Sequence, residues 1–172
     1  MRRLRERRDI EAMLMGLDAF VFCDCYEQGR LRRKPPDPEL VYVLPNGDLH
    51  CRSEDSKVLH RFDRWRENAC GHEAGIVAGD ALGNAWLISS IRDELSRRPR
   101  EFPTLLKRVI YSGTHCGDHL TLKMVSKLQT ELDRLKAHRS GNNEMDLVIE
   151  KLGRHLQKLV RASLKLSKPI AF

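Results

Sequence analysis

Aromatic residues and long apolar runs are both scarce in this chain. Phe, Trp and Tyr make up 6% of the 172 residues, so we expect a core built mainly from Leu, Ile and Val. No apolar stretch approaches the roughly 18 residues that a membrane-spanning helix needs. Internal repeats and low-complexity tracts are also missing. The sequence therefore predicts a globular protein with no membrane span.

The number of cysteines is not even, and the sequence shows no secretory signal. The five cysteines are an odd number, which argues against a disulfide framework. Residues 10–23 are fairly apolar and follow a basic start, but Glu11 and Asp18 interrupt them and no small-residue cleavage site follows. We therefore expect a cytoplasmic protein with free thiols.

Familiar catalytic signatures are lacking too. The chain contains none of the patterns GxxxxGK[ST], GxGxxG, HExxH or GxSxG, which mark P-loop, dinucleotide-binding, metalloprotease and hydrolase sites. Any site must therefore be sought among less specific residues.

The length predicts one globular domain, residues 15–172, preceded by a basic N-terminal extension, residues 1–14. The extension holds five Arg against Glu6, Asp9 and Glu11, so without it the net charge falls from +7 to +5. An over-called start, with translation beginning at Met15, is one explanation of the extension. A basic arm or a short lead-in helix is the other.

Several segments carry the signals of strands. Leu17–Cys25 is apolar on both faces, which predicts a central strand. Asn46-Gly47 lies between two apolar runs, 39–44 and 49–52, and predicts a hairpin. A second core strand is expected over Arg108–Tyr111 and a short edge strand over Ile170–Phe172, whereas Cys70–Gly83 is expected to be irregular.

Apolar residues at helical spacing predict four helices. Asn84 and Thr121 are the expected N-caps of the second and third. The predicted helices are Ser53–Ala69, Ala85–Arg97, Leu122–Ala137 and Glu144–Ser167. The expected fold class is α/β or α+β, a small mixed sheet of about 4–5 strands including one hairpin, covered by about four helices.

The loop Ser112–His119 is the first candidate site. Glycine backbone N–H groups and the following helix N-terminus favour a ligand here. His115 and Asp118 are candidate catalytic residues, as acid and base. Turn formation, with Asp118 as a cap and His115 bonded to the backbone, is the alternative. The candidate ligand-binding residues are Ser112, Gly113, Thr114 and Gly117.

Asp24 is the third candidate catalytic residue. On the predicted strand it shares a face with Phe20 and Phe22, and a buried carboxylate needs a partner. If this strand and 108–111 are parallel neighbours, Cys23–Cys25 converges with the loop 112–119. The alternative is that Asp24 lies past the strand end, in solvent or bonded to the next loop.

Cysteine and histidine also suggest a zinc site. The candidate ligands are Cys23, Cys25, Cys70, His72 and His119, all residue types that bind Zn²⁺. Their spacing, Cys-x-Cys and Cys-x-His, differs from the Cys-x₂₋₄-Cys pairs that are usual in structural zinc sites. Ordinary small core residues are the alternative.

Basic residues recur at spacings of three and four along the last predicted helix. On a helix they form one stripe, which could contact nucleic-acid phosphates. A solvated helix face is the alternative, and no aromatic residue is interleaved for base stacking. The stripe consists of Lys151, Arg154, Lys158, Arg161, Lys165 and Lys168.

Three stretches resemble a family of uncharacterised bacterial proteins. They are Met15–Cys25 (MGLDAFVFCDC), Tyr111–Asp118 (YSGTHCGD) and Lys168–Phe172 (KPIAF), and the elements Cys70-Gly71-His72 and Leu82-Gly83-Asn84 match as well. The resemblance implies one domain from Met15 onward and a bacterial origin, and it implies no activity.

Three functional hypotheses remain. The first is a small binding or interaction module with a protein or an anionic small molecule as partner. The second is a metal-dependent or acid/base enzyme that uses the His115–Asp118 loop. The third is a basic nucleic-acid-binding protein.

Overall fold

Two antiparallel sheets of unequal size organise the fold. A computed structural model describes residues 16–172, so the predicted extension 1–14 lies outside the described residues. The larger sheet has the strand order β4-β1-β6-β5, and the smaller pairs β2 with β3. Every pairing within residues 16–172 is antiparallel. The strands are β1 (Gly16–Phe22), β2 (Val41–Val43), β3 (Leu49–Cys51), β4 (Ile76–Asn84), β5 (His119–Leu120) and β6 (Ile170–Ala171).

Four α-helices lie within the described residues, close to the predicted ranges. They are α2 (Ser56–Glu67), α3 (Ala85–Leu95), α4 (Leu122–Leu135) and α5 (Asn143–Leu166). Asn84 caps α3 as predicted, because its side chain accepts a hydrogen bond from the backbone N–H of Leu87. None of the helices in residues 16–172 combines the length and the hydropathy needed to span a bilayer.

The main hydrophobic core lies between the larger sheet and helices α3, α4 and α5. Leu17, Ala19 and Val21 alternate along β1 and are fully buried on the face that meets these helices. The mixture of sheet and helices confirms the predicted fold class. The central position predicted for β1, between β4 and β6, is confirmed as well.

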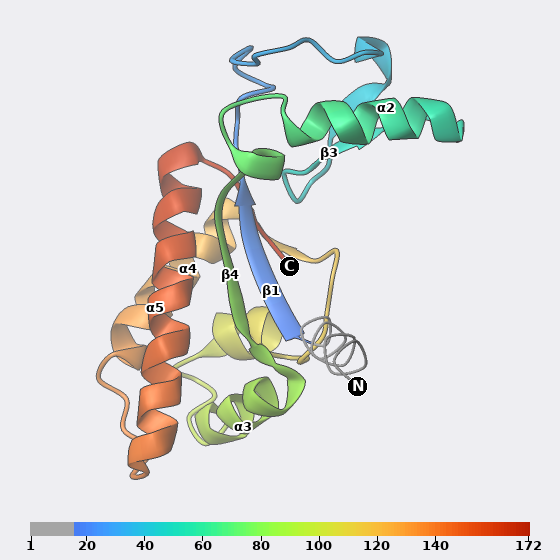
Figure 1. The fold of residues 1–172 in the computed structure, drawn as a ribbon. Helices are drawn as coiled ribbons and strands as arrows, with labels where there is room; N and C mark the ends of the chain where they lie inside the picture. The colour runs from blue at the N-terminus through green and yellow to red at the C-terminus, as the bar shows by residue number, and fades with distance from the viewer. Residues whose placement is uncertain (1–15) are drawn as a thin grey trace, which may run out of the picture.

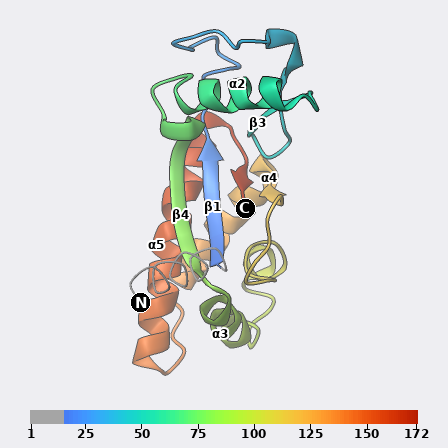
Figure 2. The same cartoon turned by 45° about the vertical axis from the view of Figure 1, so that its right-hand side comes forward.

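A second, smaller core belongs to the hairpin and α2. We call residues 26–69 the hairpin module; it includes β2, β3, α2 and a short 3₁₀ turn, Pro38–Leu40. Its buried apolar residues are Val41, Cys51, Phe62, Trp65 and Ala69. The module lies at one end of β1 and β4, and α3 lies at the other end (Figures 1 and 2).

Three local expectations were wrong. Arg108–Tyr111 is not a strand, because a π-helical turn, η3 (Leu105–Val109), occupies this segment. The segment 76–84, expected to be irregular, is the long strand β4. Finally, β6 is not an edge strand, since it pairs with β1 on one side and with β5 on the other.

Candidate metal centre

Three cysteines and a histidine meet where β1 ends and β4 begins. The first pair, Cys23 and Cys25, follows β1 directly, and the second pair, Cys70 and His72, precedes β4. Because β1 and β4 are antiparallel, the end of one strand lies beside the start of the other. The backbone N–H of Cys23 donates to the carbonyl of Gly75 at 2.7 Å and fixes this junction.

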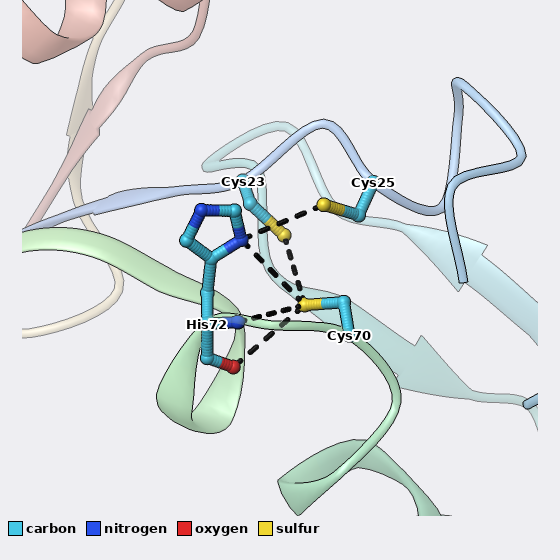
Figure 3. Close-up of side chains that lie close together, drawn as sticks. All are labelled: Cys23, Cys25, Cys70 and His72. Atoms are coloured by element: carbon cyan, nitrogen blue, oxygen red, sulfur yellow. Dashed lines mark hydrogen bonds between the residues drawn. The ribbon is translucent and has the colours of Figure 1, made fainter. Parts of the chain in front are cut away.

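Three of the distances within the cluster match the edges of a tetrahedral site. The Sγ atoms of Cys23 and Cys70 are 3.8 Å apart, and His72 Nδ1 lies 3.5 Å from Cys25 Sγ and 3.7 Å from Cys70 Sγ (Figure 3). All four candidate ligand atoms lie within 4.8 Å of one another. Zn–S and Zn–N bonds of about 2.3 and 2.0–2.1 Å require tetrahedral edges of about 3.8 Å between sulfurs and about 3.5 Å between sulfur and nitrogen. The cluster is therefore compatible with a zinc ion.

Burial raises the pKa of two thiols of the cluster, Cys23 and Cys25, and so keeps them protonated. Burial, together with the neighbouring thiols of Cys25 and Cys70, raises the pKa of Cys23 to about 12. Burial is also the main cause that raises the pKa of Cys25. A divalent metal must displace these protons, so metal binding at this cluster has to depend on pH.

One backbone N–H group donates to a sulfur of the cluster. The N–H of His72 points at Cys70 Sγ, with 3.4 Å between nitrogen and sulfur. Hydrogen bonds of this kind hold a metal ligand in place and stabilise its negative charge. After His72 the chain turns sharply, with positive φ at Ala74 and Gly75, and then enters β4.

One predicted metal ligand lies elsewhere. His119 forms part of β5, where it pairs with Ala171, and it does not belong to the cluster. The prediction for His119 was therefore wrong, whereas the other four candidate ligands are brought together.

The loop 112–119 does not converge with the cysteine cluster. Gly113 packs against Ala85, at the end of the sheet where β4 stops and β1 starts, whereas Cys23 lies at the opposite end. A Cβ atom at Gly113 would lie 2.5 Å from Ala85 Cα, so this glycine is explained by close packing. The expected convergence fails because 108–111 is not a strand beside β1.

Within that loop, the candidate acid and base are held by structural contacts. His115 Nε2 lies 2.8 Å from the carbonyl oxygen of Val109, and its Nδ1 lies 3.3 Å from Asp118. The ring stacks on Tyr111 with 4.5 Å between centroids, and the Tyr111 hydroxyl donates to Asp118. Nε2 of the histidine thus faces the backbone of η3, and Nδ1 faces the Asp118 carboxylate without forming a hydrogen bond among the described residues.

The remaining loop residues use their polar groups within the chain. The hydroxyl of Ser112 accepts from the N–H of Thr114, and the N–H of Gly117 donates to the carbonyl of Phe172. Gly117 also has a φ of +82°, which favours glycine. These contacts are those of a turn that ties the loop to the C-terminal strand.

Asp24 lies beyond β1 and not on the strand face expected for it. The strand ends at Phe22, and the Asp24 carboxylate forms an ion pair with Arg30 in the turn that follows. Its backbone carbonyl accepts from Gln28. Asp24 therefore stabilises the turn that begins the hairpin module.

The basic stripe on α5 is shorter than predicted. Lys168 lies beyond the end of α5, is buried and pairs with Glu27, so it does not belong to the exposed stripe. Lys158 is 3.0 Å from Asp80, and Arg154 is 4.0 Å from Glu150. The other three members, Lys151, Arg161 and Lys165, are exposed.

No protein-family model matches the chain, and neither a curated protein nor a solved structure is significantly similar to it.

Proposed function

We propose that the chain is a small binding module held together by one structural Zn²⁺ ion, with Cys23, Cys25, Cys70 and His72 as ligands. The observation that carries this proposal is the gathering of four donor atoms, all within 4.8 Å of one another. Three thiolates and one imidazole are a usual donor set for structural zinc.

A structural role is favoured because the protein supplies all four ligands. Catalytic zinc sites normally use three protein ligands and keep the fourth position for water or substrate. Here the fourth position is filled, and the nearest carboxylate in the sequence, Asp24, is paired with Arg30. The proposed site therefore has no place for a reacting group.

The position of the cluster explains what the metal would stabilise. The chain leaves the larger sheet after Phe22, passes Cys25, forms the hairpin module and passes Cys70 before it rejoins the sheet at Ile76. A segment of this size, with so few buried apolar residues, needs a metal or disulfide to fold stably. A metal ion at the junction closes residues 26–69 into a loop and reduces the entropy of the unfolded chain.

Metal content is the direct test. We expect full-length protein, purified without a tag under reducing conditions, to contain about one zinc per chain. Replacing Zn²⁺ by Co²⁺ should give the visible spectrum of a tetrahedral site and near-ultraviolet bands of cobalt–thiolate bonds. Cys25→Ser, Cys70→Ser and His72→Ala should each lower the zinc content.

Two residues provide matched controls. Cys116 is an exposed thiol outside the cluster, and His119 is a histidine on β5. We expect Cys116→Ser and His119→Ala to keep the full zinc content. Protein that holds no zinc, and that takes up neither zinc nor cobalt after reduction, would disprove the proposal.

Nucleic acid gains no support as the partner of the segment that contains the hairpin module. Residues 24–70 contain nine Lys and Arg and nine Asp and Glu, so this part of the chain has no excess positive charge to attract phosphates. A cytoplasmic location fits the proposal, because a reducing compartment keeps the thiols available for the metal.

A further inference from the structure

A cavity between α4 and α5 lies apart from the cysteine cluster. It has a volume of about 570 Å³, which falls within the usual range for small-molecule sites. Leu132, Leu135 and Ile149 form its apolar part. The cavity lies along the first half of α5, which begins at the end of the molecule remote from the hairpin module (Figure 1).

A glycine in the middle of α5 keeps this cavity open. Gly153 lines the cavity and has ordinary helical geometry, since it is absent from the residues with positive φ. A Cβ atom at this position would meet only Leu135, at a comfortable 3.5 Å. Glycine within a helix costs about 0.5–1 kcal/mol relative to alanine, and neither backbone conformation nor crowding requires it here. Its effect on the structure is to leave space between the two helices.

A buried histidine without hydrogen bonds also lines the cavity. The side chain of His138 is 2% exposed, and neither ring nitrogen has a hydrogen-bond partner among the described residues. The nearest acidic group, Glu94, is 3.5 Å from Nε2 but is not aligned for a hydrogen bond. Buried polar atoms in proteins are nearly always satisfied, so an unpaired imidazole beside a cavity indicates a missing partner.

Of the three cationic side chains that line the cavity, Arg139 is the one without an ion pair among the described residues. Lys136 pairs with Asp133 and Arg154 with Glu150, whereas Arg139 forms no ion pair within residues 16–172. The remaining carboxylate, Asp146, accepts two hydrogen bonds from Ser140. One guanidinium nitrogen of Arg139 donates to the backbone carbonyls of Lys136 and His138. Its other nitrogens have no such partner in the described part of the chain, and a guanidinium group can bind a carboxylate through two parallel hydrogen bonds.

We propose that the α4–α5 cavity binds a small amphipathic carboxylate, with its apolar body against Leu132, Leu135 and Ile149 and its acidic head at His138 and Arg139. The cavity would then be the ligand-binding site of the protein, independent of the proposed zinc centre.

Decanoate and 1-decanol are the probes that test this site, because they share an apolar body and differ in the head group. Titration of the full-length, zinc-loaded protein by calorimetry, and by NMR of the histidine rings, should show one decanoate per chain and a shift of the His138 resonances. Arg139 is exposed, so Arg139→Gln should fold normally. This substitution should lower the affinity for decanoate about tenfold and leave the affinity for 1-decanol unchanged.

Two substitutions fill the cavity from the α5 side. Gly153→Leu and Gln157→Phe should each abolish binding of both probes while the zinc content stays unchanged. The Gln157→Phe variant provides the test if the Gly153→Leu variant does not fold. Failure of both probes to bind the wild-type protein would overturn the proposal, as would unchanged decanoate binding in a folded filling variant. If the Arg139→Gln variant binds decanoate as tightly as the wild type does, the proposed recognition of an acidic head group is wrong.

Discussion

His72 illustrates what a single residue contributes to the cysteine cluster. It is only partly buried, and its Nδ1 atom faces the sulfurs of Cys25 and Cys70. The sequence shows the right ligand types here with an unusual spacing. Their proximity depends on the pairing of β1 with β4, and Ile76–Asn84 has two internal glycines that conceal this strand. The ligands could therefore be named from the sequence, but their grouping could not.

Substitution of His72 distinguishes a metal ligand from a residue that only packs. We expect His72→Ala to weaken zinc binding by at least about tenfold, because one ligand is lost. By contrast, His72→Cys should retain zinc, since four thiolates also form a stable tetrahedral site. Competition with a chromogenic chelator measures both affinities. Equal affinities in the alanine variant and the wild type would contradict the role of His72.

At the scale of elements, the helices could be predicted from the sequence because each has a continuous apolar face, as in α4 and α5. The turn η3 was not predicted from the sequence, because the apolar residues of Arg108–Tyr111 suggested a strand that overlaps its end. A distant residue decides its conformation. The buried carboxylate of Glu131, on α4, accepts hydrogen bonds from the N–H groups of Thr104 and Leu105, both at 2.8 Å. This contact satisfies backbone groups at the start of the turn, and local sequence cannot reveal it.

Glu131→Gln should therefore destabilise the fold by about 2–3 kcal/mol, because an amide N–H₂ group would face a buried backbone N–H. Chemical denaturation followed by circular dichroism measures the change. Asp133→Asn, on the exposed side of the same helix, should change stability by less than about 0.5 kcal/mol. Similar, small effects of both substitutions would show that Glu131 does not hold η3.

A second inter-element contact connects β4 to α5. Asp80 is 2.9 Å from His155 Nδ1 and 3.0 Å from Lys158 Nζ. Burial alone would raise the pKa of Asp80, but the close basic groups of Lys158 and His155 outweigh it and lower the pKa below its ordinary 3.8. The carboxylate thus stabilises the folded state above about pH 4, and this contribution is lost as the pH falls through its lowered pKa.

We accordingly expect Asp80→Asn to cost about 1–2 kcal/mol of stability at pH 7 and progressively less below pH 4, as the wild-type carboxylate itself becomes protonated. Urea denaturation at a series of pH values measures this dependence. Asp93→Asn, at an exposed position on α3, is the control and should show no comparable trend. A cost that stays constant down to about pH 2 would contradict the ionic character of the contact.

At the scale of the whole molecule, two cores of unequal size share one junction. Besides the cysteine cluster, several contacts join the hairpin module to the rest of the described chain. Lys168 pairs with Glu27, the turn at Gly47 lies near Pro169 and Phe22, and α2 lies beside the 3₁₀ turn Glu73–Gly75. The hairpin was predictable from Asn46-Gly47, and α2 from its apolar spacing. How the module sits on the larger sheet was not predictable, because it depends on contacts between residues far apart in the sequence.

This arrangement predicts that metal removal unfolds the hairpin module before the main core. Trp65 is buried in the module, and its Nε1–H donates to the Arg33 carbonyl at 2.9 Å, whereas Trp86 is 75% exposed. In a Trp86→Phe background, fluorescence therefore reports on the module alone. A strong chelator under reducing conditions should shift the Trp65 emission to the red and lower the opening free energy of α2 by more than about 2 kcal/mol in hydrogen exchange.

The main core provides the internal control in the same experiment. Amides of α5 should keep their protection after chelation, because α5 packs on β1 and β4 through residues such as Leu152, Leu156 and Leu159, which do not touch the module's core. Added Zn²⁺ should restore the Trp65 emission, and Mg²⁺, which prefers oxygen ligands, should not. If the chelator exposes α2 and α5 together, the two cores form one cooperative unit. If it exposes neither, the cluster does not hold the module in place.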